Sequence, residues 1–214
     1  MCITKTIVIL AKSIKHGRHC VAGKDINSKE WIRVVSDAKG SELSEQQSKC
    51  TNDNWEKEGK NPYNSGVLKK VEIIFSTHSP LIHQPENHVV LTNHVWQQKY
   101  KIEPHEIQNY LDNPKTLWGD NNDRVNYSLI SNQAVVIQQS LYLIKVDDLH
   151  LYRTVEDKRR ASFFYLNQKY DLSVTDINFD SLLETGNANS QNILCISLGE
   201  NFNGNCYKII AAIY

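Results

Sequence analysis

The chain has 214 residues, which is enough for one large domain or for two compact halves. Its hydrophobic fraction of 40% and charged fraction of 22% are typical of a globular protein, and no apolar run approaches the roughly 20 residues that span a bilayer, so we expect no membrane contact. The 24 basic and 24 acidic side chains cancel, so any nucleic-acid site has to be a local patch.

Short segments rich in Ile, Val, Tyr and Phe recur between clusters of Gly, Asn, Asp and Ser, a pattern typical of β-strands. Turn-forming residues at 24–29 and at 167–168 predict two β-hairpins. The segments predicted to be strands are 3–11, 18–24, 30–36, 67–77, 88–92, 134–147, 158–166, 169–175, 193–198 and 206–213.

One segment, residues 104–112, is predicted to be a helix, because Pro104 suits a first helical position and a proline follows the end of the apolar face. Residues 37–66 and 177–192 are polar with little periodicity and are expected to be loops, although a short helix could begin at Ser44. A loop as long as the first of these is often functional, or is ordered by a partner.

Many short strands with one helix favour a mostly β fold, built of barrels or a sandwich, over a parallel α/β sheet. The chain has no glycine-rich dinucleotide motif and no P-loop motif. The helix and the polar segment after it separate two groups of strands. We therefore predict a first domain at 1–100 that includes the long loop, a helical and loop connector at 101–133, and a second domain at 134–214.

Histidines in one short region raise the question of a metal site. Zinc ligands usually lie two to five residues apart and include cysteine or carboxylate partners, which this region lacks. We expect no metal and no cofactor. The histidines are His78, His83, His88 and His94.

The five cysteines form no Cys-x-x-Cys pair, which is typical of a reducing compartment, so a cytoplasmic location is expected. Cys20 lies four residues from His16, but on a predicted strand it is interpreted as a small packed residue rather than a reactive thiol. The adjacent carboxylates Asp147 and Asp148 point to opposite faces of an extended segment. No catalytic residue is assigned, and the chain is not expected to be an enzyme.

A first candidate ligand patch lies in the N-terminal hairpin. Residues 1–35 carry seven basic and two acidic side chains, a net charge of +5. Basic side chains neutralise phosphates, and an exposed aromatic ring can stack on a base. The alternative is that the tryptophan belongs to the core and the lysines form a solvated face. The candidate nucleic-acid-binding residues are Lys12, Lys15, His16, Arg18, Trp31 and Arg33.

A second candidate patch begins with a basic run that leads into an aromatic strand. Alternation places Arg159 and Tyr165 on one face of this strand, and Arg160 and Phe164 on the other. Both faces carry aromatic rings, so one face is core and the other is available to stack bases. Arg159 and Tyr165 are taken as the candidate binding residues, with an ordinary packed strand as the alternative.

Several short segments in a fixed order span nearly the whole chain. They are Ile9-Leu-Ala-Lys-Ser13 with Lys15-His-Gly17, Cys20-Val-Ala-Gly23, Glu30-Trp-Ile-Arg33 with Val35-Ser-Asp37, Gln84-Pro-Glu-Asn87, Ser140-Leu-Tyr-Leu-Ile-Lys145, Tyr170 with Val174-Thr-Asp176, and Ser197-Leu-Gly-Glu200 with Cys206-Tyr-Lys208. Their combination resembles the dual OB-containing domain family of bacterial proteins. One departure is Val34, where that family tends to have proline after Trp-Ile-Arg.

The resemblance implies a mostly β chain of two small OB-like, five-stranded β-barrels packed together, with one or two short helices. It also implies nucleic-acid binding, within a prokaryotic defence or mobile-element system. No catalytic residues come with it. Because OB barrels also bind oligosaccharides and proteins, the step from fold to ligand is an analogy.

Three functions remain open from the sequence. The first is a non-catalytic nucleic-acid-binding module for single-stranded or structured nucleic acid. The second is a subunit that docks a partner protein, which the zero net charge fits equally well. The third is a nucleotide-processing enzyme, for which no motif argues. A basic groove would favour the first, and an exposed apolar patch the second.

Overall fold

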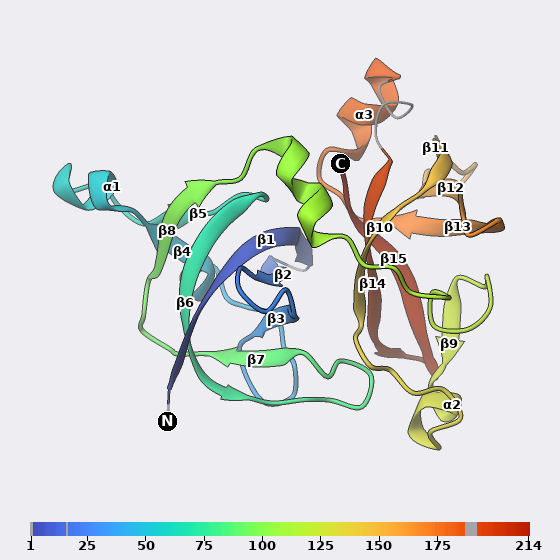
Figure 1. Ribbon diagram of the computed structural model, residues 1–214, viewed down its shortest axis with the longest axis horizontal. Coiled ribbons are helices and arrows are strands. Elements are labelled where there is room, and N and C mark those ends of the chain that lie inside the picture. Colours follow the sequence, from blue (N-terminus) through green and yellow to red (C-terminus); the bar gives the residue numbers. More distant parts are fainter. Residues whose placement is uncertain (1, 16, 187–191) are drawn as a thin grey trace. The chain divides into compact units, whose positions relative to one another are not determined.

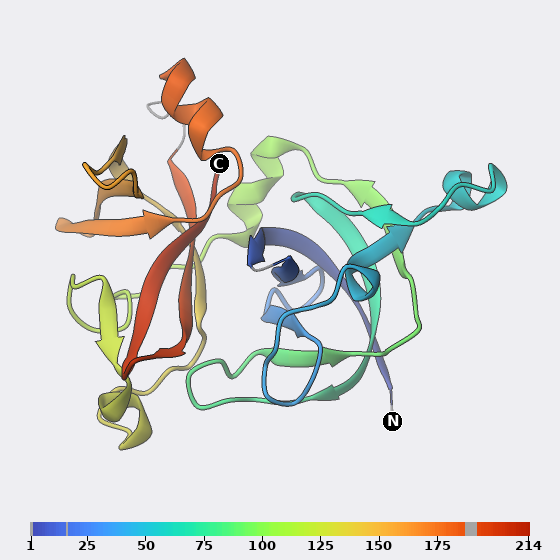
Figure 2. The ribbon, with the colours of Figure 1, turned by 180° about the vertical axis from the view of Figure 1, so that it is seen from behind.

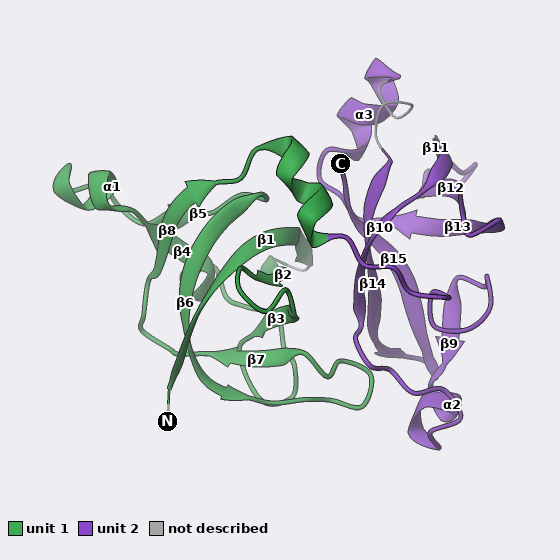
Figure 3. Cartoon of the chain, viewed as in Figure 1, with its two compact units in different colours: residues 1–110 green, residues 111–214 purple. Residues whose placement is uncertain are grey.

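The computed structural model describes residues 2–15, 17–186 and 192–214, and no helix in these ranges is long and apolar enough to cross a membrane. The chain forms two compact units, residues 1–110 and 111–214, which Figure 3 colours separately. Strands dominate both units, which confirms the mostly β prediction. The segment 101–133, expected to be a connector, is divided between the units at residue 110.

Five strands of the first unit form a closed barrel (Figure 1). Along the barrel the order is β1-β2-β3-β7-β6, and β6 pairs back with β1. Every pair is antiparallel except β3 with β7. Counted along the chain, β3 and β7 are the third and fifth strands of the barrel, and they are parallel neighbours as in an OB barrel. The strands are β1 (Ile3–Lys15), β2 (Arg18–Asp25), β3 (Trp31–Val35), β6 (Lys69–His78) and β7 (Asn87–Val90).

The long strand β1 serves two neighbours, because its first half pairs with β6 and its second half with β2. The register with β2 shifts between Ile9 and Ala11. Gly23 of β2 faces this bend, where an added Cβ would lie 2.1 Å from the carbonyl oxygen of Val8. A side chain at this position therefore cannot be accommodated without moving backbone. β3 continues through Val34, so the absence of proline there does not end the strand early.

The segment 37–66, predicted to be a loop, holds several short elements. They are the 3-10 helix η1 (Gln46–Ser48), β4 (Lys49–Thr51), α1 (Asp53–Lys57) and β5 (Tyr63–Asn64). Asn52 caps α1, since its side chain accepts a hydrogen bond from the backbone NH of Trp55 at 2.9 Å. β8 (Trp96–Lys101), which was not predicted, pairs with both β6 and β4 and so ties this segment to the barrel.

The predicted helix at 104–112 is the 3-10 helix η2 (Pro104–Tyr110). Ile107 and Tyr110 are its buried residues. The Lys24 ammonium donates a hydrogen bond to the Tyr110 carbonyl oxygen at 2.8 Å, and the Lys29 ammonium lies 4.1 Å from the Tyr110 ring centroid. This helix therefore belongs to the first unit and is held against the β2–β3 hairpin.

The second unit repeats the strand order of the first. Its sheet runs β10-β14-β15-β13-β12-β11, and β13 with β15 is the parallel pair. Only Val146 separates β10 from β11, so together they act as one bent first strand that pairs with β14 and with β12. Figure 2 shows these strands from behind. They are β10 (Leu141–Lys145), β11 (Asp147–Arg153), β12 (Arg159–Tyr165), β13 (Gln168–Val174), β14 (Ile193–Phe202) and β15 (Asn205–Ile213).

The strand predicted at 134–147 is thus shorter than expected, and β11, which was not predicted, follows it. The register between β11 and β12 shifts between Asp147 and His150, and Asp148 has a φ of 50°. The adjacent carboxylates therefore mark an irregular bend between two strand segments. The C-terminal strand forms as predicted, and most of its residues are buried.

Short helices and one edge strand complete the second unit: β9 (Arg124–Asn126), α2 (Tyr127–Ser131) and α3 (Phe179–Thr185). Among the described residues there are three α-helices and two 3-10 helices, where one or two short helices were expected. None exceeds seven residues, and α1 and α2 begin at capping asparagines inside segments with loop-like composition.

Candidate nucleic-acid interface

The first predicted patch is only partly available to a ligand. The Lys12 ammonium donates a hydrogen bond to the Ser65 carbonyl oxygen at 2.7 Å, and burial lowers the pKa of Lys12 below its usual value. Arg18 is exposed beside the hairpin turn. Lys15 pairs with Arg18 through the backbone, but its side chain is not described, and His16 lies outside the described residues.

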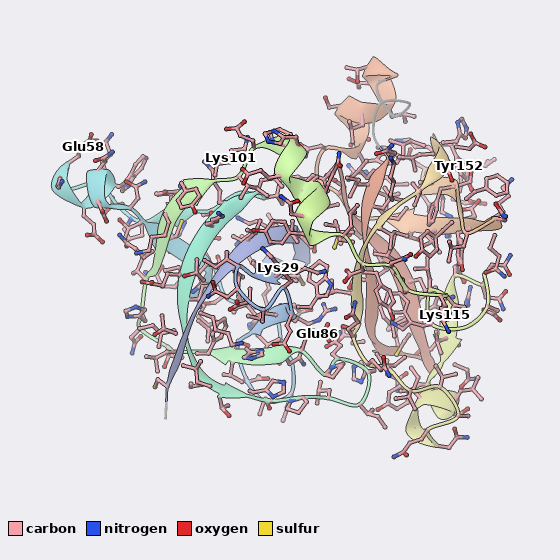
Figure 4. All side chains as sticks on the ribbon, in the orientation of Figure 1. Lys29, Glu58, Glu86, Lys101, Lys115 and Tyr152 are labelled. Carbon is pink, nitrogen blue, oxygen red and sulfur yellow. The ribbon has the colours of Figure 1, made fainter. Side chains whose placement is uncertain are left out.

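Trp31 and Arg33 lie on the outward side of the β2–β3 hairpin, yet neither offers an open surface. The Trp31 side chain is 4% exposed, and the Lys24 ammonium lies 5.3 Å from its ring centroid. The Arg33 guanidinium lies 3.5 Å from the Glu86 carboxylate, and Figure 4 labels Glu86. Ala22 is also buried on this side. The burial of Trp31 leaves no ring face for a base, so stacking on Trp31 is not supported.

Two histidines of the first unit, His78 and His88, bond to backbone carbonyl oxygens. His78 and His88 face each other across β6 and β7 with ring centroids 4.6 Å apart. A ring nitrogen of His78 is 2.7 Å from the Pro85 carbonyl oxygen, and one of His88 is 2.9 Å from that of Glu86. Burial lowers the pKa of His88. The described residues contain no group of three or more His, Cys, Asp or Glu side chains placed to hold a metal ion.

In the second barrel, Tyr165 of the candidate pair Arg159 and Tyr165 lies on the core side of β12. Tyr165 is 6% exposed, its hydroxyl donates a hydrogen bond to the Pro114 carbonyl oxygen at 2.7 Å, and burial raises its pKa to about 12. Phe163, on the same side, packs in the core against Tyr170 with ring centroids 5.5 Å apart. Arg159 lies at the end of this side, where it forms an ion pair with Asp180.

The opposite side of β12 is the open one, and with its neighbours it forms a surface that we call the ring face. Phe164, which is 37% exposed, points outward from β12. The strand pairing places cross-strand rows of residues from β11, β12 and β13 beside one another. The ring face comprises His150, Tyr152, Arg160, Ser162, Phe164, Lys169, Asp171 and Ser173.

Three of these side chains present aromatic rings. The rings of His150 and Tyr152 are nearly parallel, with centroids 6.0 Å apart and planes 14° apart. His150 is exposed and Tyr152 is half-buried. Figure 4 labels Tyr152 at β11. With Phe164, they supply aromatic surface on two neighbouring strands, as a ligand with flat rings requires.

A hydrogen-bonded network holds the polar side chains of the ring face in place. Asp171 accepts from the Tyr152 hydroxyl at 2.5 Å and from Arg160 Nε at 2.8 Å. Arg160 also donates to the Asp171 carbonyl oxygen at 2.7 Å and to the Ser173 hydroxyl at 3.2 Å. The hydrogen bond to Asp171 raises the pKa of Tyr152. Arg160 therefore mainly holds Asp171 and Ser173 in place. Lys169 is the exposed cation of the ring face.

Two loops border such a face in OB barrels, those between the first and second strands and between the fourth and fifth. Here they are residues 154–158 and the tight turn at Asn203 and Gly204. Each carries an exposed apolar residue at or beside it: Val155 is fully exposed, and Phe202 is 63% exposed.

Sequence reasoning missed His150, Tyr152 and Lys169. A signal for the first two is the segment Leu149-His-Leu-Tyr152, where apolar residues alternate with polar or amphipathic ones. In β13, Lys169, Asp171 and Ser173 alternate with buried Tyr170, Leu172 and Val174 in the same way. These neighbours identify the solvated side of the sheet, which β12 alone does not.

Comparison with known proteins assigns a family. Residues 5–213 match the family model described as "Dual OB-containing domain", which is nearly the whole chain. No curated protein and no solved structure matches it significantly.

Proposed function

Because the chain belongs to the dual OB-containing domain family, we propose that it is a non-catalytic module that binds single-stranded nucleic acid on the ring face of its second barrel. The observation that carries this proposal is the outward exposure of Phe164 beside His150 and Tyr152. Phe164 stands on the second strand of the barrel, which with the third strand forms the face that OB barrels usually use to bind oligonucleotides. His150 and Tyr152 stand beside it on the first strand.

The chemistry of the ring face favours unpaired bases. A base in a duplex is stacked on its neighbours, whereas a single strand can turn its bases toward aromatic side chains. Such stacking contributes about 1–3 kcal/mol per base and tolerates any sequence. Phe164 and the pair of His150 and Tyr152 offer two stacking positions on adjacent strands.

Contacts between basic side chains and phosphates are expected to contribute less to binding than stacking does. Arg160 is already bonded to Asp171, which leaves Lys169 as the main cation of the ring face for a phosphate. Each phosphate contact to a single strand contributes about −0.7 to the slope of log K against log salt concentration. We therefore expect a shallow slope, of about −0.7 to −1.4, for a site that binds mainly by stacking.

The family resemblance supports a role in a prokaryotic defence or mobile-element system. The five cysteines, all among the described residues, form no disulfide, which supports a reducing, cytoplasmic location. Docking of a partner protein on the ring face is the competing function, and the binding experiment separates the two.

The test is a titration of the full chain with single-stranded DNA, single-stranded RNA and duplex DNA of one length, at roughly 50 and 200 mM salt. We expect either single strand to bind more tightly than the duplex, with a shallow salt slope. Equal or tighter binding of the duplex would contradict stacking on unpaired bases. Absence of binding at the lower salt concentration would overturn the proposal in favour of protein docking.

A further inference from the structure

The hairpin that ends β11 and begins β12 places two arginines opposite each other. Arg153 and Arg159 are cross-strand partners in this hairpin. Like charges in directly opposed positions repel, so an anion between them stabilises this arrangement. Their side chains are 32% and 35% exposed, so solvent and solutes reach both guanidinium groups.

Asp180 of α3 supplies the anion in this structure. One carboxylate oxygen of Asp180 accepts from Arg153 and the other accepts from Arg159. Hydrogen bonding from Arg153 lowers the pKa of Asp180. The guanidinium groups also lie 5.8 and 5.6 Å from the ring centroid of buried Phe179, which helps to hold both in place. Two guanidinium groups fixed around one oxyanion form a geometry that suits a phosphate as well as a carboxylate.

The position of this arginine pair connects it to the ring face. Along the strands, Arg153 follows Tyr152 directly and Arg159 precedes Arg160. The loop between them, residues 154–158, joins the first and second strands of the barrel, and this loop commonly contacts ligands in OB barrels. The side chains of this arginine pair lie on the opposite side of the strands from the ring face, so a strand bound on the ring face would reach them by passing around the hairpin end.

We propose that Arg153 and Arg159 form a phosphate clamp that Asp180 occupies in the free protein, and that a backbone phosphate of the bound single strand displaces Asp180. This inference rests on the proposed function. Displacement breaks the contacts of Asp180 with the hairpin, so ligand binding at the clamp loosens α3 while Phe179 stays packed in the core. The contest between phosphate and carboxylate reduces the affinity of the wild-type protein.

Another carboxylate at the hairpin, Asp157, provides a control variant for Asp180→Ser. Asp157 also contacts Arg153, with its carboxylate 2.6 Å from Nη1, but it does not reach across to Arg159. Glu156 accepts from the Thr154 hydroxyl, and Lys158 is exposed in the same loop. Asp180→Ser and Asp157→Ser each remove one negative charge beside Arg153, yet only the first opens the clamp.

The test compares these variants with the wild type in a titration with a single-stranded thymidine oligonucleotide. We expect Asp180→Ser to bind about three- to tenfold more tightly with a similar salt slope, because the clamp binds the same phosphate in both proteins. Asp157→Ser should change the affinity less than about twofold. Equal increases in affinity in both variants, or no increase in Asp180→Ser, would overturn the clamp.

Hydrogen exchange of the wild type gives a readout that does not depend on a folded variant. Adding the oligonucleotide should speed exchange across residues 179–185 and slow it in β11 and β12. Unchanged or slower exchange at 179–185 would overturn displacement of Asp180. If the wild type binds and Asp180→Ser does not bind more tightly, the clamp fails and the proposed function stands. If neither protein binds the oligonucleotide, the clamp and the proposed function both fail.

Discussion

Phe163 and Phe164 are adjacent in the sequence and lie on opposite sides of β12, with 1% and 37% of their surfaces exposed. Phe163 pairs with Tyr170 and stacks on it in the core, whereas Phe164 pairs with Lys169 on the ring face. One strand thus joins the core of the second barrel to its proposed ligand surface.

Replacing these two residues should separate stability from binding. Phe163→Ala removes a buried ring and should lower the free energy of unfolding by about 3–5 kcal/mol. Phe164→Ala should lower it by less than about 1 kcal/mol, because the side chain is largely at the surface. Urea denaturation measures both values, and similar losses would contradict the assignment of the two faces.

Gly23 should tolerate no side chain. Its added Cβ would lie 2.1 Å from the Val8 carbonyl oxygen, so Gly23→Ala has to shift the backbone of β1 and should destabilise the protein by more than about 2 kcal/mol. Gly66→Ala is the matched control in the same unit, because nothing lies within 4 Å of its added Cβ. Thermal unfolding compares them. Equal melting temperatures would show that the first barrel bends differently at this point.

Lys208 should make stability depend on pH. Its side chain is fully buried, its ammonium donates to the Asp120 carbonyl oxygen at 2.6 Å, and burial lowers its pKa to about 8. Between pH 8 and the usual value of 10.5, the unfolded chain keeps a proton that the folded protein has lost, so the free energy of unfolding rises with pH.

The size of this rise is at most about 3 kcal/mol. Lys208→Met has no proton to lose, so it should lack the rise and should gain stability over the wild type at pH 7, where the buried charge is costly. Urea denaturation from pH 7 to 10.5 measures both proteins. Parallel curves would show that Lys208 keeps its proton in the fold.

Tyr165 should contribute to stability and not to binding. Tyr165→Phe keeps the core ring but removes the hydrogen bond to Pro114, so the free energy of unfolding should fall by about 1 kcal/mol. The affinity for single strands should stay within about twofold of the wild type. A larger loss of affinity in a titration would show that Tyr165 contributes to ligand binding.

The sequence predicted the strands better than it predicted their exposure. The alternation in β12 identified two faces, but both carry an arginine and an aromatic ring, so the core side became clear only from the neighbours in β11 and β13. β11 itself was missed because its irregular start at Asp147 and Asp148 resembles a loop.

Trp31 shows a second limit of sequence reasoning. Trp31 lies on the same side of β3 as Arg33, and alternation along a strand does not show what covers that side of a sheet. The basic and aromatic residues of the N-terminal hairpin resembled a ligand site by composition. Several of them instead hold the first unit together, Lys12 through Ser65 and Lys24 through Tyr110.

If single strands bind by stacking on the ring face, Phe164→Ala should weaken binding, because Phe164 is the most exposed ring of β12. Tyr100→Ala is the control, because Tyr100 is a 59% exposed ring of the first unit with a lysine ammonium 4.2 Å from its centroid. We expect Phe164→Ala to weaken single-strand binding by about 1–3 kcal/mol, or roughly five- to 150-fold, with an unchanged salt slope. Tyr100→Ala should bind like the wild type. Equal affinities of Phe164→Ala and the wild type would show that single strands do not stack on the ring face.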